Sequence, residues 1–294
     1  MVLTAATLWA VNGAVSKVIL TSGGLASERL TQVRATGAFL LLFGALLVVR
    51  RSNLRVSVSE LPFLIVFGVG GLAFVAWFYF VAIERLEIGI ALLIQYVAPV
   101  LVALYARYVL HQPVRRRIWL ALALSMLGLS LLLQLWQGLE LDGIGLLASV
   151  GAAITFALYI LLADYGLRSR STSSLLAYGF LFAAIFWAVV QPWTSFPWDL
   201  LDESVSLLGR LGDTELPVWL LIGWMVTLGT IIPFGLLVAS LRHITATRAG
   251  ILAMFEPVAG TIVAYAWLRE ELEPLQLVGA AVVLCGIGLA QTAR

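Results

Sequence analysis

Apolar stretches of about 20 residues recur along this sequence from residue 2 to residue 291, and this pattern constrains the fold most strongly. A helix of that length crosses the ~30 Å hydrocarbon core of a bilayer. A β-barrel is excluded, because its strands alternate apolar and polar residues over ~10 positions, whereas these runs are continuous and rich in Leu, Ala and Gly. The chain is 62% hydrophobic and 12% charged, so it has about half the charge of an ordinary soluble domain. We therefore expect an all-α membrane protein.

Ten such stretches are separated by links that carry charged residues. The stretches cover residues 2–20, 29–49, 61–83, 88–110, 118–135, 143–163, 174–192, 217–241, 246–268 and 274–291. The first begins at Val2 with no basic region before it, so we do not expect a cleavable signal peptide. The spacing predicts ten transmembrane helices in contact with the lipid bilayer.

Basic residues collect in every second link, and such residues are retained on the cytoplasmic side of a membrane. They are Arg50, Arg51, Arg55, Arg115, Arg116, Arg117, Arg168, Arg170, Arg242, Arg248 and Arg294. The alternate links carry Glu28, Glu84, Glu87, Glu140, Asp142, Asp199, Asp202, Glu203, Asp213, Glu215, Glu270, Glu271 and Glu273, opposed by Arg29, Arg85, Arg210 and Arg269. This alternation predicts a multi-pass protein with both termini in the cytoplasm.

The longest link, residues 193–216, falls on the external side in this scheme. We expect its amphipathic part, Leu200–Leu211, to form a short helix at the interface, with Trp193 and Trp198 at headgroup level. The alternative is a lid over a path through the helices.

The two halves of the sequence match each other when it is shifted by 158 residues. The shift places Gly71 on Gly229, Ala91 on Ala249, Pro99 on Pro257, Leu110 on Leu268 and Gly128 on Gly286. When the comparison is extended to the first and sixth stretches, Trp9 falls near Phe156 and Asn12 near Tyr159. We therefore divide the chain into two related five-helix repeats, residues 1–137 and 138–294.

The second repeat is expected to be inverted, because an odd number of helices brings the chain into the membrane from the opposite side. The link after the fourth stretch contains Arg115, Arg116 and Arg117, while its counterpart after the ninth contains Glu270, Glu271 and Glu273. Inverted repeats that enclose a site at the membrane midplane are a recurrent architecture of secondary transporters. The pattern thus favours two inverted five-helix repeats around a central cavity.

Several short motifs resemble those of the EamA-type exporters of the drug/metabolite transporter superfamily. They are Trp9-Ala10-Val11-Asn12 with Lys17, Arg34, Gln95-Tyr96-Val97-Ala98-Pro99, Glu256-Pro257, Leu268-Arg269-Glu270-Glu271-Leu272, and the segment from Gly279 to Gly286. The resemblance extends over essentially the whole chain and departs at Gln112, where the first repeat often has an acidic residue. It implies ten helices around a central cavity, a location in the bacterial inner membrane, and export of amino acids or similar small metabolites.

Glu256 is the clearest candidate for a functional group, because it lies near the middle of the ninth stretch. A carboxylate at that depth is unfavourable by several kcal/mol unless it is protonated, paired or hydrated. Pro257 and Pro99 each lack the N–H that would bond to the carbonyl one turn earlier, so both are expected to kink their helices. Glu256 is then a substrate contact or a proton-coupling group. The alternative is a neutral Glu256 that holds the kink by a hydrogen bond to a neighbouring helix.

Other polar and aromatic side chains lie well inside the stretches and could line the same cavity. They are Trp9, Asn12, Trp77, Gln95, Tyr96 and Tyr159. Aromatic walls with a few polar groups suit a small amphipathic ligand, although ordinary packing is the alternative for each aromatic ring. Lys17 and Arg34 lie nearer the external ends and could form a cationic vestibule. Alternatively, both extend to the external headgroups or pair with acidic links.

The sequence lacks several motifs that other functions require. It contains no G-x-x-x-x-G-K-[ST] segment, and His111 and His243 have no Cys or second His nearby. Its only cysteine, Cys285, cannot form an internal disulfide. We expect no metal, no cofactor and no nucleic-acid partner. The expected partners are a small-molecule substrate and protons, and the expected assembly is a monomer or a homodimer. A non-enzymatic secondary carrier is favoured over an intramembrane enzyme and over a membrane scaffold or receptor subunit.

Overall fold

The computed structural model describes residues 1–83, 85–86, 88–134, 142–269 and 271–292. Part of the expected charge alternation lies outside these residues, at Glu84, Glu87, Glu140, Glu270 and Arg294. Within the described part of the chain, nine helical stretches are long and apolar enough to cross a membrane. The expected all-α, multi-pass membrane architecture is therefore confirmed.

The helices of the first half are α1 (Val2–Thr21), α2 (Ser27–Val49), α3 (Leu61–Ile65), α4 (Phe74–Ile83), α5 (Ile88–Gln95), α6 (Ala98–Tyr108) and α7 (Arg116–Leu132). Those of the second half are α8 (Gly143–Gly166), α9 (Thr172–Val190), α10 (Val218–Val226), α11 (Ile232–Ser240), α12 (Ala246–Ala253), α13 (Phe255–Leu268) and α14 (Pro274–Thr292). Two π-helical segments, η3 (Val66–Ala73) and η7 (Thr227–Ile231), join α3 to α4 and α10 to α11. Short 3-10 turns cover Arg51–Leu54, Val58–Glu60, Trp193–Ser195, Trp198–Leu201 and Gly209–Leu211.

Two of the predicted stretches are interrupted beside a proline. Pro99 and Pro257 have no backbone N–H, so each leaves a carbonyl of the preceding turn without its helical donor. In the fourth stretch α5 ends at Gln95 and α6 begins at Ala98, so that Pro99 is in the first turn of α6. In the ninth, Met254 separates α12 from α13, and Pro257 lies in the first turn of α13. Both stretches therefore consist of two half-helices.

The long link after α9 contains a small β-ribbon instead of the expected interfacial helix. Strand β1 (Ser204–Ser206) pairs antiparallel with β2 (Glu215–Pro217), with Val205 opposite Leu216. The helix predicted over Leu200–Leu211 was wrong. That segment contains only two short turns and β1, and Val205 and Leu207 turn their apolar side chains inward. Alternation of buried and exposed side chains is the pattern of a strand, and it produced the apparent amphipathicity.

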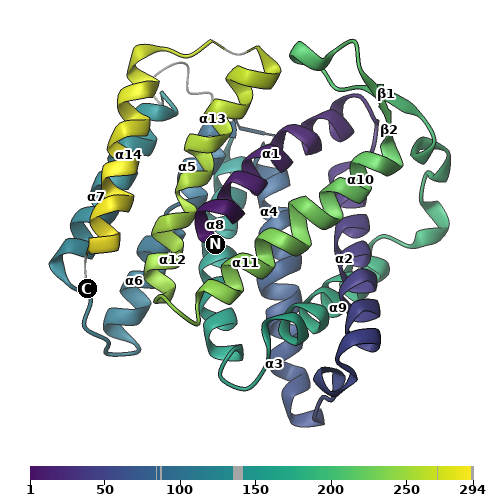
Figure 1. The fold of residues 1–294 in the computed structure, drawn as a ribbon, viewed down its shortest axis with the longest axis horizontal. Coiled ribbons are helices and arrows are strands. Elements are labelled where there is room, and N and C mark those ends of the chain that lie inside the picture. The colour runs from purple at the N-terminus through teal and green to yellow at the C-terminus, as the bar shows by residue number, and fades with distance from the viewer. Residues whose placement is uncertain (84, 87, 135–141, 270, 293–294) are drawn as a thin grey trace.

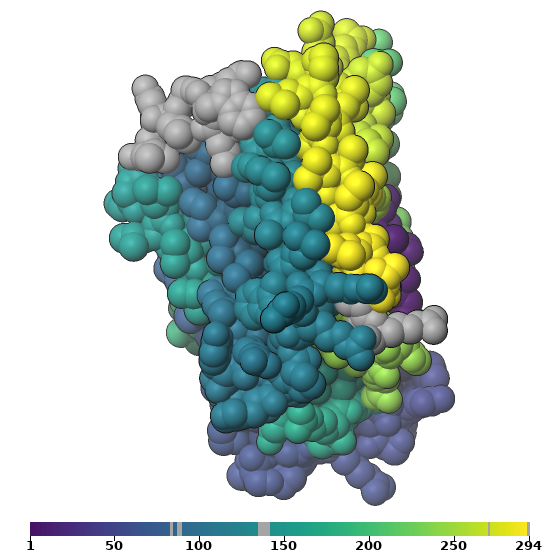
Figure 2. Space-filling view, turned by 90° about the vertical axis from the view of Figure 1, so that its left-hand side faces the viewer, coloured from purple at the N-terminus to yellow at the C-terminus, as the bar shows by residue number. Residues whose placement is uncertain are grey.

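Helices α7 and α14 pack along each other at one side of the molecule (Figures 1 and 2). A Cβ atom added to Gly128 would lie 2.5 Å from the backbone nitrogen of Val283 and 2.8 Å from the carbonyl oxygen of Gly279. Gly279 meets the backbone of Leu132 in the same way, and Gly286 meets Ser125. The residue numbers of the partners on α14 thus decrease as those on α7 increase, so the two helices are antiparallel. Their backbones come into contact at the glycines.

Helices α2 and α9 lie on the opposite side of the molecule and are joined at both ends (Figure 1). At one end, Arg29 and the Gln32 amide donate to the carbonyl oxygen of Gln191, over 3.3 and 2.6 Å. At the other end, the hydroxyl of Ser174 donates to the carbonyl oxygen of Asn53 over 2.6 Å. These bonds use carbonyl groups that helix ends leave without partners.

We expect Arg29→Gln to destabilise the protein by about 3 kcal/mol, because breaking several bonds of a buried charged group has effects of that size. Arg29 is 9% exposed and also donates to Ser195 Oγ over 2.6 Å and to the carbonyl oxygen of Pro192 over 3.1 Å. Thermal unfolding of the purified protein in detergent measures the effect. The exposed Arg50 gives the matched control, since Arg50→Gln should change the free energy of unfolding by less than about 0.5 kcal/mol.

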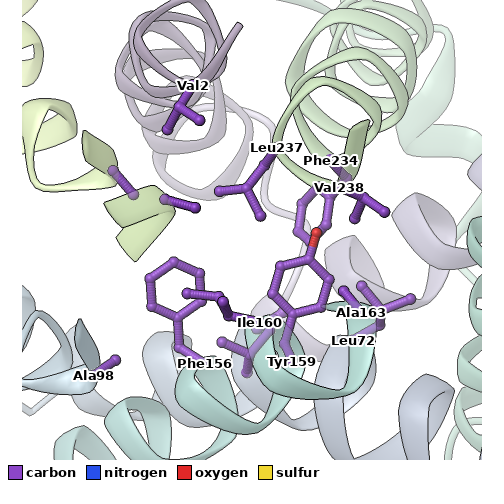
Figure 3. Packing of buried hydrophobic residues seen from close by; sticks show 14 of the residues in the cluster. Val2, Leu72, Ala98, Phe156, Tyr159, Ile160, Ala163, Phe234, Leu237 and Val238 are labelled. Atoms are coloured by element: carbon purple, nitrogen blue, oxygen red, sulfur yellow. The ribbon is translucent and has the colours of Figure 1, made fainter. Parts of the chain in front are cut away.

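Part of the buried core lies between α8 and α11. Figure 3 shows Phe156, Tyr159 and Ile160 of α8 facing Phe234 and Leu237 of α11. Tyr159, Ile160 and Leu237 are fully buried. This contact joins the first helix of the second half to α11, and it forms one wall of the site described next.

Candidate functional site

The two interrupted stretches meet at a hydrogen bond between Tyr96 and Glu256. The Tyr96 hydroxyl donates to Glu256 Oε2 over 2.6 Å. Tyr96 follows the last residue of α5, and Glu256 is the second residue of α13. Helix N-termini carry a partial positive charge, so the first turn of α13 is a favourable place for a carboxylate. The interruptions thus bring a phenol and a carboxyl group together within the membrane-spanning region.

Two more polar side chains surround this pair. Arg34 of α2 and Tyr79 of α4 lie close enough to Glu256 to interact with its charge. The Arg34 guanidinium also lies over the ring of Phe234, 5.6 Å from its centroid, in a cation–π contact. Unlike charges in a region of low dielectric attract each other strongly even without direct contact. Arg34 is therefore grouped with Glu256, although sequence analysis had grouped it with Lys17.

Lys17 itself is exposed on α1. A vestibule that combines Lys17 with Arg34 stays a prediction.

An aromatic chain connects the Tyr96–Glu256 pair to α1. The ring centroid of Tyr96 lies 6.2 Å from that of Phe156, which stacks on Tyr159 at 6.2 Å. Tyr159 and Trp9 both contact the ring of Phe234 edge to face, at 5.3 and 5.2 Å. The structure thus brings Trp9, Tyr96 and Tyr159 into one cluster.

Trp77 lies in a different aromatic group. Its ring is 6.5 Å from that of Trp187 on α9, and it contacts Phe74 and Phe78 of its own helix. Its membership of the same site stays a prediction.

Three predicted site residues carry polar atoms that have no hydrogen-bond partner among the described residues. These atoms are Asn12 Oδ1, Gln95 Oε1 and Tyr159 Oη. Buried polar groups in folded proteins nearly always have a partner, which can be water. Asn12 is 8% exposed and Tyr159 is fully buried. Such groups are suited to bind water or a polar solute that enters the bundle.

Glycines of the two π-helical segments allow the close approach of Asn12 and Tyr159. A Cβ atom on Gly229 of η7 would overlap the side chain of Asn12. A Cβ atom on Gly71 of η3 would lie 3.2 Å from the Cα of Tyr159. π-Helical turns occur frequently at functional sites, and here both lie against residues of the cluster.

Two cavities lie away from this cluster of residues. One, of about 590 Å³, is lined by Arg210, Tyr265, Arg269 and Glu271, and the other, of about 400 Å³, lies between α2, α9 and α11. The central cavity expected from the sequence stays a prediction. Within the described ranges, no cluster of three or more His, Cys, Asp or Glu residues could hold a metal ion.

Sequence analysis missed Tyr79 and Phe234. A tyrosine hydroxyl in the middle of a span needs a polar partner, and that signal could have identified Tyr79. Phe234 carries no such signal, because it is one of many apolar residues in an apolar helix. Its contacts with Trp9, Tyr159 and Arg34 depend on how α11 packs.

We expect Tyr96→Phe to lower the free energy of unfolding by about 1–2 kcal/mol, because it leaves a buried carboxyl oxygen without its donor. Thermal unfolding in detergent measures the effect. Tyr79→Phe is the matched control, since it removes a neighbouring hydroxyl but leaves the bond to Glu256 in place. An equal loss in both variants would contradict a specific role for the Tyr96 hydroxyl.

The chain is similar in sequence to several known proteins. A protein of Archaeoglobus fulgidus described as an uncharacterized transporter is 28% identical over 72% of this chain and 70% of its own length. The uncharacterized transporter YwfM of Bacillus subtilis strain 168 is 26% identical over 97% of this chain and 90% of its own. The threonine/homoserine exporter RhtA of Escherichia coli strain K12 is 27% identical over 80% of this chain and 73% of its own.

A solved crystal structure has the same fold, with a TM-score of 0.77 over 98% of this chain and 94% of that one. At 19% identity this likeness concerns the fold alone. The sequence model of the EamA-like transporter family matches residues 1–134 and again residues 143–292, which together make up nearly the whole chain. The expected resemblance is confirmed, and the chain belongs to the EamA-like transporter family.

Proposed function

We propose that this protein is a secondary transporter that exports amino acids or related small metabolites across the bacterial inner membrane by alternating access. The observation that carries the proposal is the Tyr96–Glu256 hydrogen bond, which joins the interruptions of two spans from different halves of the chain. Carriers bind substrates near the membrane midplane, between discontinuous helices whose free ends supply polar groups. The similarity to RhtA, a threonine/homoserine exporter, supports amino acids as the substrate class.

We also propose that α7 is the tenth span. Its 17 residues correspond to about 26 Å at 1.5 Å per residue, which is near the lower limit for crossing the hydrocarbon core. Its antiparallel contact with α14, itself long enough to span, supports this count.

The halves are proposed to be inverted repeats, residues 1–137 and 138–294. Two separate matches to the family model, one in each half, support the division. Reciprocal contacts support the inversion: Gly128 of α7 meets Val283 of α14, and Gly286, the counterpart of Gly128, meets Ser125, the counterpart of Val283. A two-fold axis between the halves produces contacts of this kind. The matching positions of η3 and η7, which contain Gly71 and its counterpart Gly229, agree with it.

The charges of the site suit a zwitterion. Arg34 can bind a carboxylate through two parallel N–H groups, and Glu256 can accept hydrogen bonds from an ammonium group. Tyr96 would release Glu256 when the substrate arrives. Trp9 and Tyr159 would contact the apolar part of the substrate, and the free oxygens of Asn12 and Gln95 would select polar substituents.

Glu256 is further proposed to carry the coupled proton. Intramembrane carboxyl groups serve as proton relays in pumps and transporters, and Glu256 is the acidic residue that the site contains. The proposed orientation places both termini and the arginine-rich links in the cytoplasm.

Flux through proteoliposomes tests the proposal. Vesicles that contain the purified protein and are preloaded with unlabelled threonine should accumulate radiolabelled threonine or homoserine by exchange, with saturation. Protein-free vesicles are the control. Lack of saturable flux across a panel of amino acids, nucleosides and polyamines would contradict a carrier and favour a scaffold or receptor subunit, whereas a chemically altered substrate would indicate an intramembrane enzyme.

A further inference from the structure

A crevice of about 400 Å³ between α2, α9 and α11 is separate from the Tyr96–Glu256 site. It lies at the arginine-rich end of the bundle. Arg242, on its rim, donates to the carbonyl oxygen of Arg170, and Arg170 in turn donates to both carboxylate oxygens of Glu60, over 3.0 and 2.8 Å. The volume is within the range of ligand-binding cavities in proteins.

The crevice is polar at its mouth and apolar at its depth. At the mouth lie the exposed guanidinium of Arg242 and the hydroxyls of Ser171 and Ser173, where α9 begins. The deeper wall includes Leu176 of α9 and Ile231, the residue before α11. Ile231 lies about 13 Å along the helix axis from Ser240, where α11 ends. A ligand that fills this space must combine an anionic or strongly polar group with an apolar chain.

The neighbouring surface faces the hydrocarbon. Leu42 lines the crevice and its sequence neighbour Leu41 is 50% exposed; Ile231 lines it and its neighbour Ile232 is 41% exposed. Large exposed apolar side chains on a membrane-spanning helix contact lipid tails. The apolar wall of the crevice therefore continues into the lipid-facing surface of α2 and α11.

The cavity at the opposite end of the bundle lacks this combination. It is larger, about 590 Å³, but Glu271 shares its lining with Arg210 and Arg269, and an acidic side chain opposes a bound anion.

We propose that the crevice binds one anionic phospholipid of the bilayer. The phosphate of the headgroup would accept hydrogen bonds from Arg242 and from the hydroxyls of Ser171 and Ser173, and an acyl chain would lie along Leu42 and Ile231. Basic pockets between transmembrane helices bind such headgroups, and phosphate prefers bidentate contact with arginine. A soluble phosphate compound would use the mouth and leave the apolar wall uncovered, so the lipid is the occupant that the whole crevice fits.

Thermal unfolding of the purified full-length protein in detergent tests the site. Phosphatidylglycerol should raise Tm with saturation, while phosphatidylcholine and inorganic phosphate at equal concentration should not. Arg242→Gln should weaken the phosphatidylglycerol affinity about five-fold, because a basic residue at the membrane surface contributes ~1 kcal/mol to anionic lipid binding. Arg248→Gln, in the first turn of α12 and outside the crevice lining, is the matched control.

A second variant fills the crevice without disturbing the fold. A Cβ atom on Gly235, which lines the crevice, would meet no atom within 4 Å, so Gly235→Leu should fold and lose the response to phosphatidylglycerol. Gly223→Leu places the same side chain at an exposed, equally open position of α10 and should keep the response.

Equal Tm shifts with both lipids, or an undiminished response in Arg242→Gln and Gly235→Leu, would overturn the proposal. A shift with inorganic phosphate as large as that with phosphatidylglycerol would also overturn it, in favour of a soluble phosphate compound.

Discussion

Glu256→Gln is expected to reduce exchange flux in proteoliposomes roughly ten- to hundred-fold while the protein stays folded. Glutamine has nearly the same size as glutamate and can still accept a hydrogen bond from the Tyr96 hydroxyl. In the structure this bond to Glu256 is 2.6 Å long. It cannot attract a cationic group or the Arg34 guanidinium. Hydrogen bonds to charged groups contribute about 1.5–3 kcal/mol, and each 1.4 kcal/mol corresponds to a factor of ten.

The control is Glu203→Gln, which neutralises an exposed glutamate in the link that contains β1 and should keep full flux. Comparing flux with and without an imposed pH gradient separates the two roles proposed for Glu256. A variant that still exchanges substrate but no longer responds to the gradient supports proton coupling. If Glu256→Gln retained the full response to the gradient, proton coupling at Glu256 would be ruled out.

Gly279→Ala is expected to destabilise the protein by about 3 kcal/mol or more, although alanine is the best helix former. The added methyl group would overlap the backbone nitrogen of Leu132 and lie 2.7 Å from the carbonyl oxygen of Gly128. Backbone atoms cannot rotate away as side chains do, so α7 and α14 must separate along their whole contact. Overpacking lowers the free energy of unfolding by about 1–3 kcal/mol where side chains can adjust, and the backbone atoms that the new methyl group meets here cannot adjust.

Gly288→Ala on the same helix is expected to have the opposite effect on stability. Gly288 is exposed, and a Cβ atom there meets no atom within 4 Å. The substitution should stabilise α14 by up to about 1 kcal/mol, because glycine is a poor helix former. Thermal unfolding and the yield of folded protein in detergent measure both variants. Similar Tm values for the two would disprove the close contact of α7 with α14.

The spans could be predicted from the sequence because a bilayer requires long apolar helices. The interruptions at Tyr96 and Met254 could be anticipated from Pro99 and Pro257, since a missing N–H acts locally. Which side chains of a span face the protein interior and which face lipid could not be predicted. In a soluble helix polar residues mark the outer face, but lipid and protein interior are equally apolar, so nothing in the sequence of α11 distinguishes the buried Phe234 from the exposed Ile232.

For the same reason, the sequence could not show that Arg34 lies near Glu256. Its position in the sequence placed Arg34 near the external end of its span, whereas its contact with Phe234 and its proximity to Glu256 depend on the rotation of α2 about its axis. The π-helical segments were equally hidden. An extra residue in one turn leaves no mark in composition, and only the close contacts of Gly71 and Gly229 reveal why these turns matter.

The bonds at both ends of α2 and α9 limit how the bundle can rearrange. Two helices anchored at one end could splay like scissors, whereas anchoring at both ends removes that motion and leaves only displacement of the pair as a rigid block. Exchange of access from one side of the membrane to the other would then require bending elsewhere. The interrupted spans and the π-helical turns are the places where the backbone is already irregular enough to bend.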